Sequence, residues 1–388
     1  MERLTPMTHA DSAARPDSDP DPARLGCALV DALRGLGLCA AGERLEPLAD
    51  TGLAHWHLRI PGTGWLARVP KQSQLGLAPA AHLAYEAACF ERAQAGGHAP
   101  RLHAALPPSA SLPHGALLVD EIVGRPARLP HDLPRLVDAL AALHALPLPA
   151  GPDRAPLLCP ADPLQALRDE IELQAAHLDR AGLAPAARAR IEHERAALAR
   201  RCAGAARPRT ALVAFDGHPG NFVVDAHGRA WLVDLEKARY GHPAVDLAHA
   251  TLYTSTTWDR ASHAALSVAE VAAACERWCE RVAADAAERA WIVPLRRAMW
   301  LWSVTWCAKW RVMSGRPPAA ATAGGEDWSA ALSEAALVAH VRDRVDHYLS
   351  RDVVDRVCEE ADALDAALAA SASSASNRPA NTASRRTA

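Results

Sequence analysis

The order of extended and helical patterns along the chain is the feature that most limits its fold. Short extended runs bounded by turn residues fill the segment 43–122, interrupted by one helical pattern over 80–94. Beyond Gly124, long helical patterns dominate, and a single hairpin is predicted over 221–235. Runs of strands followed by runs of helices are typical of α+β proteins, whereas parallel-sheet folds alternate the two. The sequence therefore predicts an α+β fold with a small antiparallel sheet and a large, mainly helical half.

Turn residues and apolar spacing place the individual elements. Strands are predicted at 43–49, 54–60, 65–69, 101–105 and 116–122. Helices are predicted over 23–39, 80–94, 133–146, 163–181, 185–203, 268–284, 290–312 and 329–369, the last as two helices. Polar, repetitive composition predicts disordered tails over 1–22 and 371–388. The chain between them divides into an N-terminal lobe over 23–122 and a helical lobe over 123–370, and a ligand cleft is expected at their boundary.

Composition and charge exclude several classes of protein. The 388 residues carry 42 Lys+Arg against 45 Asp+Glu, and no basic run stands out, which argues against a nucleic-acid partner. Met1 to Asp21 contains no apolar stretch, and no uncharged apolar run reaches the roughly 20 residues of a membrane span. The nine cysteines lack the regular framework of a small secreted domain. A cytoplasmic protein with reduced thiols and no membrane anchor is therefore expected.

The predicted hairpin carries the densest group of chemically active residues. Asp216 and Asn221 lie five positions apart across a loop whose Gly and Pro residues exclude helix, and Asp234 ends the second strand. The hairpin turn brings Asp234 back beside this loop. Phosphoryl transfer needs a carboxylate that takes or orients the proton of the attacking hydroxyl, and a second carboxylate with an amide oxygen that holds Mg²⁺. The arrangement predicts Asp216 as the catalytic residue and Asn221 and Asp234 as Mg²⁺ ligands.

These motifs resemble those of the aminoglycoside phosphotransferase and choline kinase superfamily, which has a two-lobed, protein kinase-like fold. Asp216-Gly217-His218-Pro219-Gly220-Asn221 resembles its catalytic loop, and Leu232-Val233-Asp234-Leu235-Glu236 resembles its metal-binding strand end. Gly241-His242-Pro243-Ala244-Val245-Asp246 resembles the segment that follows. The resemblance implies that Asp246 supports the catalytic loop from behind.

The N-terminal segments resemble the phosphate-binding parts of the same superfamily, in the expected order. Asp50-Thr51-Gly52-Leu53 resembles the turn that covers the phosphates, which implies contacts from Thr51 and Gly52. Leu66-Ala67-Arg68-Val69 resembles the strand whose basic residue meets the α- and β-phosphates. The resemblance implies that Arg68 has this role and that Glu86, on the following helix, pairs with it.

The segment 117–124 resembles the hinge whose backbone contacts adenine, with Asp120 and Ile122 as the implied binding residues. The resemblance covers roughly residues 43–255. It implies ATP, with GTP as an alternative, and Mg²⁺ as cofactors. The implied reaction is transfer of the γ-phosphate to a hydroxyl of a small-molecule acceptor.

The chain departs from the superfamily pattern directly before Asp216. Members usually carry His-Gly there, and this chain carries Ala214-Phe215. Since that His mainly braces the loop by hydrogen bonds, its absence bears on loop geometry more than on the chemistry. Two alternatives stay open: a non-catalytic nucleotide-binding pseudokinase of the same fold, and a metal-dependent phosphohydrolase, because paired Asp residues also build such sites. An Asx turn would explain Asp216 and Asn221 alone, but not the spacing of Asp234 and Asp246.

Tryptophans recur on one helix of the C-terminal half. Trp302, Trp306 and Trp310 repeat every four residues, next to Trp300. Such a stripe is typical of a core-facing helix, and the alternative is an aromatic wall that binds a cationic acceptor. The acceptor itself stays open among aminoglycosides, choline-like amines, amino alcohols and sugars.

Overall fold

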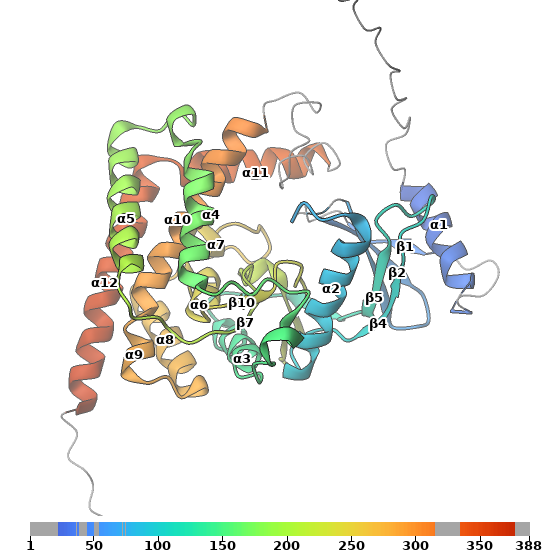
Figure 1. The fold of residues 1–388 in the computed structure, drawn as a ribbon, viewed down its shortest axis with the longest axis horizontal. Helices are drawn as coiled ribbons and strands as arrows, with labels where there is room; N and C mark the ends of the chain where they lie inside the picture. Colours follow the sequence, from blue (N-terminus) through green and yellow to red (C-terminus); the bar gives the residue numbers. More distant parts are fainter. Residues whose placement is uncertain are drawn as a thin grey trace, which may run out of the picture.

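The computed structural model describes residues 22–35, 37–38, 45–49, 54–71, 73, 75–314 and 334–376. Within these ranges, the strands of the first third of the chain gather on one side of the molecule and the long helices on the other (Figure 1). The predicted segregation into a sheet lobe and a helical lobe is confirmed. None of the helices in these ranges is both long and apolar enough to cross a bilayer.

The smaller lobe is an antiparallel sheet of order β1-β2-β3-β5-β4. Its strands are β1 (Glu46–Pro47), β2 (His55–Ile60), β3 (Trp65–Pro70), β4 (Leu102–Leu106) and β5 (Ala116–Asp120), and its helices are α1 (Pro22–Gly35) and α2 (Pro79–Ala93). Successive residues of a strand face opposite sides of the sheet. Leu118 accordingly packs in one apolar cluster with α1, and Leu117 and Val119 pack in another with α2. The two helices therefore cover opposite faces of the sheet.

The larger lobe is built around one long helix, α10 (Ile292–Met313), which packs against α4, α5, α6, α11 and α12. The other helices of the lobe are α3 (Leu133–His144), α4 (Pro163–Ala175), α5 (Pro185–Ala203), α6 (Ala244–Thr251), α7 (Tyr253–Thr256), α8 (Val268–Val282), α9 (Ala286–Arg289), α11 (Ala335–Tyr348) and α12 (Arg351–Ser376). Trp300 and Trp310 of α10 are fully buried, and Trp306 packs against the same core. The prediction of a core-facing tryptophan stripe is confirmed.

Two small sheets lie in the chain directly after the connection between the lobes and carry the predicted catalytic segment. β6 (Gly124–Pro126), β8 (Phe222–Asp225) and β9 (Ala230–Leu232) form one sheet, and β7 (Ala211–Val213) and β10 (Arg239–Gly241) form the other. β6 follows the interlobe connection and pairs with β8. A Cβ atom at Gly124 would lie 2.5 Å from the carbonyl oxygen of Val224, so only glycine permits this close pairing. The connection between the lobes is thereby attached to the predicted catalytic hairpin.

Several boundaries differ from the sequence-based predictions. α4 ends at Ala175 instead of reaching Ala181, because a short 3-10 turn over Leu178–Arg180 replaces its last part. Other 3-10 turns lie at Gln94–Gly96, Gly151–Arg154 and Pro219–Asn221. α12 continues to Ser376, beyond the predicted start of the C-terminal tail at Ser371, because its Ala-rich end favours helix. Most of the predicted N-terminal tail lies outside the described residues.

Candidate active site

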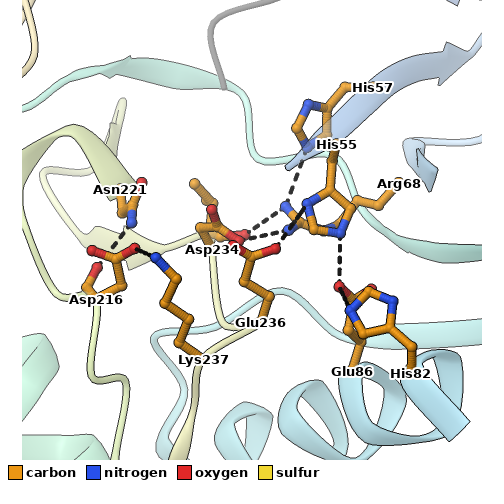
Figure 2. Close-up of polar contacts among 11 residues, drawn as sticks. His55, His57, Arg68, His82, Glu86, Asp216, Asn221, Asp234, Glu236 and Lys237 are labelled. Carbon is orange, nitrogen blue, oxygen red and sulfur yellow. Dashed lines mark hydrogen bonds and ion pairs between the residues drawn. The ribbon is translucent and has the colours of Figure 1, made fainter. Parts of the chain in front are cut away.

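The loop between β7 and β8 holds Asp216 and Asn221 in one compact turn. Asn221 donates from Nδ2 to the main-chain oxygen of Asp216 at 2.8 Å, and its N–H donates to the carbonyl of His218 at 3.0 Å. The prediction that this loop excludes helix needs one correction, since Pro219–Asn221 form a 3-10 turn that begins at the proline. The side-chain oxygen of Asn221 is left as an acceptor for another group (Figure 2).

Asp246, at the start of α6, lies behind this loop and is fully buried. Its two carboxylate oxygens accept the main-chain N–H groups of Ala214 at 2.7 Å and Phe215 at 2.8 Å. It also contacts His144 Nε2 at 3.0 Å. Two main-chain donors on one carboxylate define the path of the chain directly before Asp216. The loop therefore has a brace that does not depend on a side chain at 214 or 215.

The tautomer of His144 follows from its second neighbour. The indole nitrogen of Trp278 lies 3.0 Å from His144 Nδ1. An indole N–H can only donate, so Nδ1 accepts and Nε2 carries the hydrogen that His144 donates to Asp246. Since Trp278 and His144 are both buried, this support of Asp246 is shielded from solvent.

Phe215 occupies a left-handed backbone conformation, with φ of 63°. For a residue other than glycine this conformation costs about 1–2 kcal/mol. The Arg239 guanidinium lies 3.7 Å from the centre of the phenyl ring, and the Trp302 ring meets it edge-on at 5.3 Å and 88°. Cation–π and edge-to-face contacts of this kind are each worth about 1 kcal/mol, so they can offset the backbone strain.

Cations and imidazoles surround the carboxylate of Asp216. Lys237 Nζ donates to Oδ2 at 2.9 Å, and Oδ1 lies 3.6 Å from His249 Nδ1 and 3.9 Å from His218 Nε2. Burial opposes ionisation of Asp216, but Lys237, His218 and His249 together outweigh it and hold its pKa well below the usual range. Burial in turn lowers the pKa of His249 to about 4. Asp216 is therefore a carboxylate flanked by a neutral, buried imidazole.

Oxygen atoms suited to a divalent cation gather at the end of β9. Ligand atoms of His55, Asp234 and Glu236 lie within 4.8 Å of one another. Glu236 Oε2 is buried and lies 3.3 Å from His55 Nδ1, but off the line of a hydrogen bond. Burial raises the pKa of Glu236 well above its usual range, and the Asp234 carboxylate adds to this. Since Mg²⁺ prefers carboxylate and amide oxygens, the carboxyl groups of Asp234 and Glu236 fit such an ion. Asn221, whose main-chain oxygen accepts the N–H of Val233 at 3.0 Å, stays the predicted amide ligand.

Arg68 reaches from β3 across the lobe boundary to the same place. Its guanidinium donates to Asp234 Oδ1 at 2.7 Å and to the carbonyl of Val233 at 3.0 Å, and it lies 3.2 Å from His57 Nε2. Its side chain is only 4% exposed, so the charge is balanced by its neighbours and not by water. Burial disfavours the charged form of Arg68, but Asp234 and the nearby glutamates reverse this and raise its pKa. The structure thus brings together Arg68 from the smaller lobe and Asp234 from the larger lobe, two residues that the sequence motifs had singled out.

Glu86, on α2, is fully buried beside two histidines. Its Oε1 lies 2.8 Å from His55 Nε2 and 3.2 Å from His82 Nε2. Burial opposes ionisation of Glu86, but these two histidines outweigh it and hold its pKa well below the usual range. The predicted direct pair with Arg68 is not found among the described residues. His55, which lies 3.4 Å from Arg68, stands between the two because the long guanidinium extends past α2 to Asp234.

Residues 48–291 of the chain match the phosphotransferase enzyme family. The chain belongs to this family. A search of curated proteins finds no match to this sequence.

Several solved structures share the fold of this chain. The GDP complex of aminoglycoside 2′-phosphotransferase-IIIa has a TM-score of 0.55 at 12% identity, covering 84% of this chain and 98% of that one. Macrolide 2′-phosphotransferase from Brachybacterium faecium has a TM-score of 0.51 at 18% identity, covering 82% and 98%. A choline/ethanolamine kinase family protein from Mesorhizobium loti has a TM-score of 0.50 at 19% identity, covering 83% and 99%. The two-lobed, kinase-like α+β fold predicted for the chain is confirmed.

The structure places the two predicted hinge residues, Asp120 and Ile122, at and just after the end of β5. The main-chain N–H of Asp120 donates to the carbonyl of Arg101, and its carboxylate contacts His103 Nε2 at 2.7 Å. Ile122 follows β5 and is half-buried. Thr51 and Gly52 lie outside the described residues, so their contact with phosphates stays a prediction.

Sequence reasoning missed several residues of this site. His55 and His82 hold Glu86, and Lys237 and His249 contact Asp216. Lys237 directly follows the Asp234 motif, which is the one signal that could have identified it. The two N-lobe histidines offered no such signal, because their contacts depend on how β2 pairs with β3 and how α2 lies on the sheet.

Proposed function

We propose that the phosphotransferase moves the γ-phosphate of ATP to a hydroxyl of a small molecule, with Mg²⁺ as cofactor. The observation that carries this proposal is the contact of Arg68 with Asp234 across the lobe boundary, beside the loop of Asp216 and Asn221. It assembles in one place a cation for phosphates, oxygen ligands for a metal and a carboxylate for the acceptor. Phosphoryl transfer depends mainly on such positioning and charge neutralisation.

Each residue has a distinct role in this proposal. Asp216 orients the acceptor hydroxyl and takes its proton late, as the low pKa of its carboxylate favours. Asn221 and Asp234, with Glu236 beside them, hold Mg²⁺, which neutralises charge on the phosphates. Arg68 contacts the α- and β-phosphates.

The other predicted site residues contact the nucleotide or support the loop in this proposal. Thr51 and Gly52 would cover the phosphates, and the backbone near Asp120 and Ile122 would meet the base. Asp246 supports the catalytic loop through the two main-chain N–H groups that it accepts. The aminoglycoside 2′-phosphotransferase-IIIa structure contains GDP, so GTP is proposed as the alternative donor. ATP and Mg²⁺ are abundant in the cytoplasm, where we expect the enzyme to act.

A pseudokinase of the same fold is the second candidate. Asp234 already holds the Arg68 guanidinium, and Asp216 already holds the Lys237 ammonium. If these pairs persist when a nucleotide is present, neither carboxylate can serve the reaction. The chain would then bind nucleotide without transferring phosphate.

Nucleotide binding is the first measurement that tests the proposal. Thermal unfolding is followed with Mg²⁺-ATP and Mg²⁺-GTP for the wild type, Asp234→Ala and the control Asp343→Ala, which removes an exposed carboxylate of α11. A nucleotide at 100 times its Kd should stabilise the wild type by about 2.7 kcal/mol. Loss of this effect in Asp234→Ala alone supports the metal assignment, and no effect in the wild type contradicts the proposal.

Phosphate transfer is tested next by ADP release in the presence of hydroxyl-bearing acceptors. The named relatives suggest a panel of macrolides, aminoglycosides, choline and ethanolamine. Nucleotide binding with no ADP release from any acceptor would favour the pseudokinase. Phosphate release from simple phosphate esters without nucleotide would favour a phosphohydrolase.

A further inference from the structure

Four side chains from four elements close around the residue that precedes Asp216. Phe215 comes from the catalytic loop, Glu170 from α4, Arg239 from β10 and Trp302 from α10. Glu170 joins the two groups that touch the phenyl ring. Its Oε1 accepts Arg239 at 2.5 Å, and its Oε2 accepts the Trp302 indole N–H at 3.0 Å. These four residues, named here the Phe215 cluster, form a closed ring of contacts.

The Phe215 cluster reaches Asp216 by two separate routes. The first is the main chain, because Phe215 is the neighbour of Asp216 and has a left-handed φ of 63°. The second passes through Arg239, whose Nε donates to the carbonyl of Lys237 at 3.2 Å, while Lys237 Nζ binds the Asp216 carboxylate at 2.9 Å. The cluster therefore bears on both the backbone and the charge partner of Asp216.

The chemistry of the cluster suits a rigid support. A planar guanidinium can stack on a ring and hold a carboxylate at the same time, which an ammonium cannot. Arg239 is 9% exposed and Phe215 is 4% exposed, so water competes little with these contacts. A phenyl ring held on two sides also prevents the backbone at 215 from relaxing to a negative φ.

We propose that the Phe215 cluster is a positioning unit that sets the location of the Asp216 carboxylate, with Phe215, Arg239 and Glu170 as positioning residues. This inference rests on the proposed role of Asp216. None of the contacts of Phe215, Arg239 and Glu170 described above involves Arg68, Asp234 or Glu86. Loss of the unit therefore lowers the rate of transfer and leaves nucleotide binding unchanged.

The decisive variant is Phe215→Gly. Glycine adopts the left-handed conformation without strain, so a site that needs only this backbone shape would keep its activity. If the ring is the support, kcat for ADP release falls about tenfold, as expected for a reacting group displaced by a fraction of an ångström. The KM for Mg²⁺-ATP should stay within about twofold of the wild type, since the phosphate-binding side is untouched.

Arg239→Lys and Glu170→Gln test the rest of the ring with conservative changes. Lysine keeps the charge but loses the planar stacking, and glutamine keeps a carbonyl acceptor but loses the charge. Both should lower kcat in the same way as Phe215→Gly, and their effects should not add. The matched control is Arg297→Lys, at an arginine that binds Glu194 at 2.9 Å in the helical lobe. Its kcat should match the wild type.

Two results would overturn the inference. One is a wild-type kcat in Phe215→Gly or Arg239→Lys. The other is a loss of kcat/KM that comes entirely from a rise in the KM for Mg²⁺-ATP, which would indicate general damage to the fold. The midpoint of thermal unfolding is measured for each variant to separate these cases.

Hydrogen exchange distinguishes failure of this inference from failure of the proposed function. If the wild type releases no ADP with any acceptor, exchange is measured over residues 211–222, where Asp246→Asn serves as the reference for a loosened loop. Faster exchange there in Phe215→Gly and Arg239→Lys, but not in Arg297→Lys, supports positioning by the cluster even in a protein without transfer activity. Unchanged exchange in these variants contradicts it.

Discussion

The two halves of the site hold their buried carboxylates by different means. On the helical side, Asp246 accepts two main-chain N–H groups and a histidine whose tautomer is set by Trp278. On the sheet side, Glu86 is held by two histidine side chains, and Arg68 is held by the Asp234 carboxylate and the Val233 carbonyl. Main-chain donors neither titrate nor change rotamer, whereas histidines can do both and a long side chain such as that of Arg68 can change rotamer.

This difference matches what each half would have to do. The group that orients an acceptor must be held within a fraction of an ångström during the reaction. The groups that meet a nucleotide must exchange one set of partners for another when it arrives. Arg68, for example, has to leave Asp234 if both are to serve Mg²⁺-ATP. We therefore expect changes on the helical side to alter kcat and stability, and changes on the sheet side to alter nucleotide affinity.

The largest effect is expected from Asp216→Asn. An amide cannot take the acceptor proton, so kcat for ADP release should fall by roughly 10²–10⁴-fold. The Kd for Mg²⁺-ATP should stay within about twofold, because Arg68 and Asp234 are unchanged. Calorimetric titration measures the Kd, and coupled ADP detection measures kcat. Equal losses in binding and turnover would break the proposed division between the two halves.

Asp246→Asn should give the next largest effect, on stability. The amide group of Asn would face one of the two main-chain N–H donors of the loop, and a buried donor would lose its partner. Breaking a buried charged interaction costs about 4 kcal/mol. The free energy of unfolding in urea should fall by this amount, whereas the exposed control Asp343→Asn should change it by less than about 0.5 kcal/mol. A neutral effect of Asp246→Asn would mean that the loop is braced by other contacts.

The convergence of Asp216, Asn221 and Asp234 was predictable from the sequence. Gly and Pro residues punctuate the catalytic loop, and a hairpin turn of Ala226-His227-Gly228 returns the chain to it. These turn residues can be recognised in the sequence without knowledge of the fold. β6, β7 and β10 were not predicted, because three residues are too few to show a strand period.

The partners of Glu86 and Phe215 were not predictable, for two physical reasons. The contact of His55 with Glu86 depends on the position of α2 on the sheet, which no local pattern specifies. The left-handed φ of Phe215 is disfavoured for an aromatic residue, and it occurs together with tertiary contacts of its ring with Arg239 and Trp302 and of its N–H with Asp246. Contacts between distant segments decide both outcomes, so the resemblance-based pairing of Arg68 with Glu86 was wrong in detail.

The pH dependence of stability should report His249. Burial lowers the pKa of this residue to about 4 from 6.5, and the charged or titratable groups facing it are Asp216, His218, Lys237 and Asp246. The unfolded chain binds a proton below pH 6.5 and the folded chain does not. The stabilisation is therefore complete above pH 6.5 and falls by about 3 kcal/mol as the pH drops to about 4.

His249→Gln should remove this part of the pH dependence. Other histidines with lowered pKa values, such as His57 and His242, titrate in both proteins. The difference between the wild type and the variant therefore isolates His249. Urea unfolding at pH 7.5, 6 and 4.5 measures it. If the free energy of unfolding depends on pH in the same way in both proteins, the imidazole of His249 is hydrated. That result would weaken the contrast between a fixed helical side and an adjustable sheet side.

The smallest effect is expected from Glu86→Gln, on the sheet side. Glu86 is ionised at neutral pH because its pKa is held well below the usual range. Glutamine removes that charge and leaves His55 free to turn away from α2, so Arg68 loses its indirect support. The Kd for Mg²⁺-ATP should rise about tenfold, which corresponds to about 1.4 kcal/mol.

The control for Glu86→Gln is Glu91→Gln, at an exposed residue of the same helix. This variant should bind nucleotide like the wild type. The value of kcat at saturating nucleotide should not change, because Asp216 is held by other groups. If Glu86→Gln lowers kcat and leaves the Kd unchanged, the sheet side also positions the acceptor, and the two halves do not divide the work as proposed.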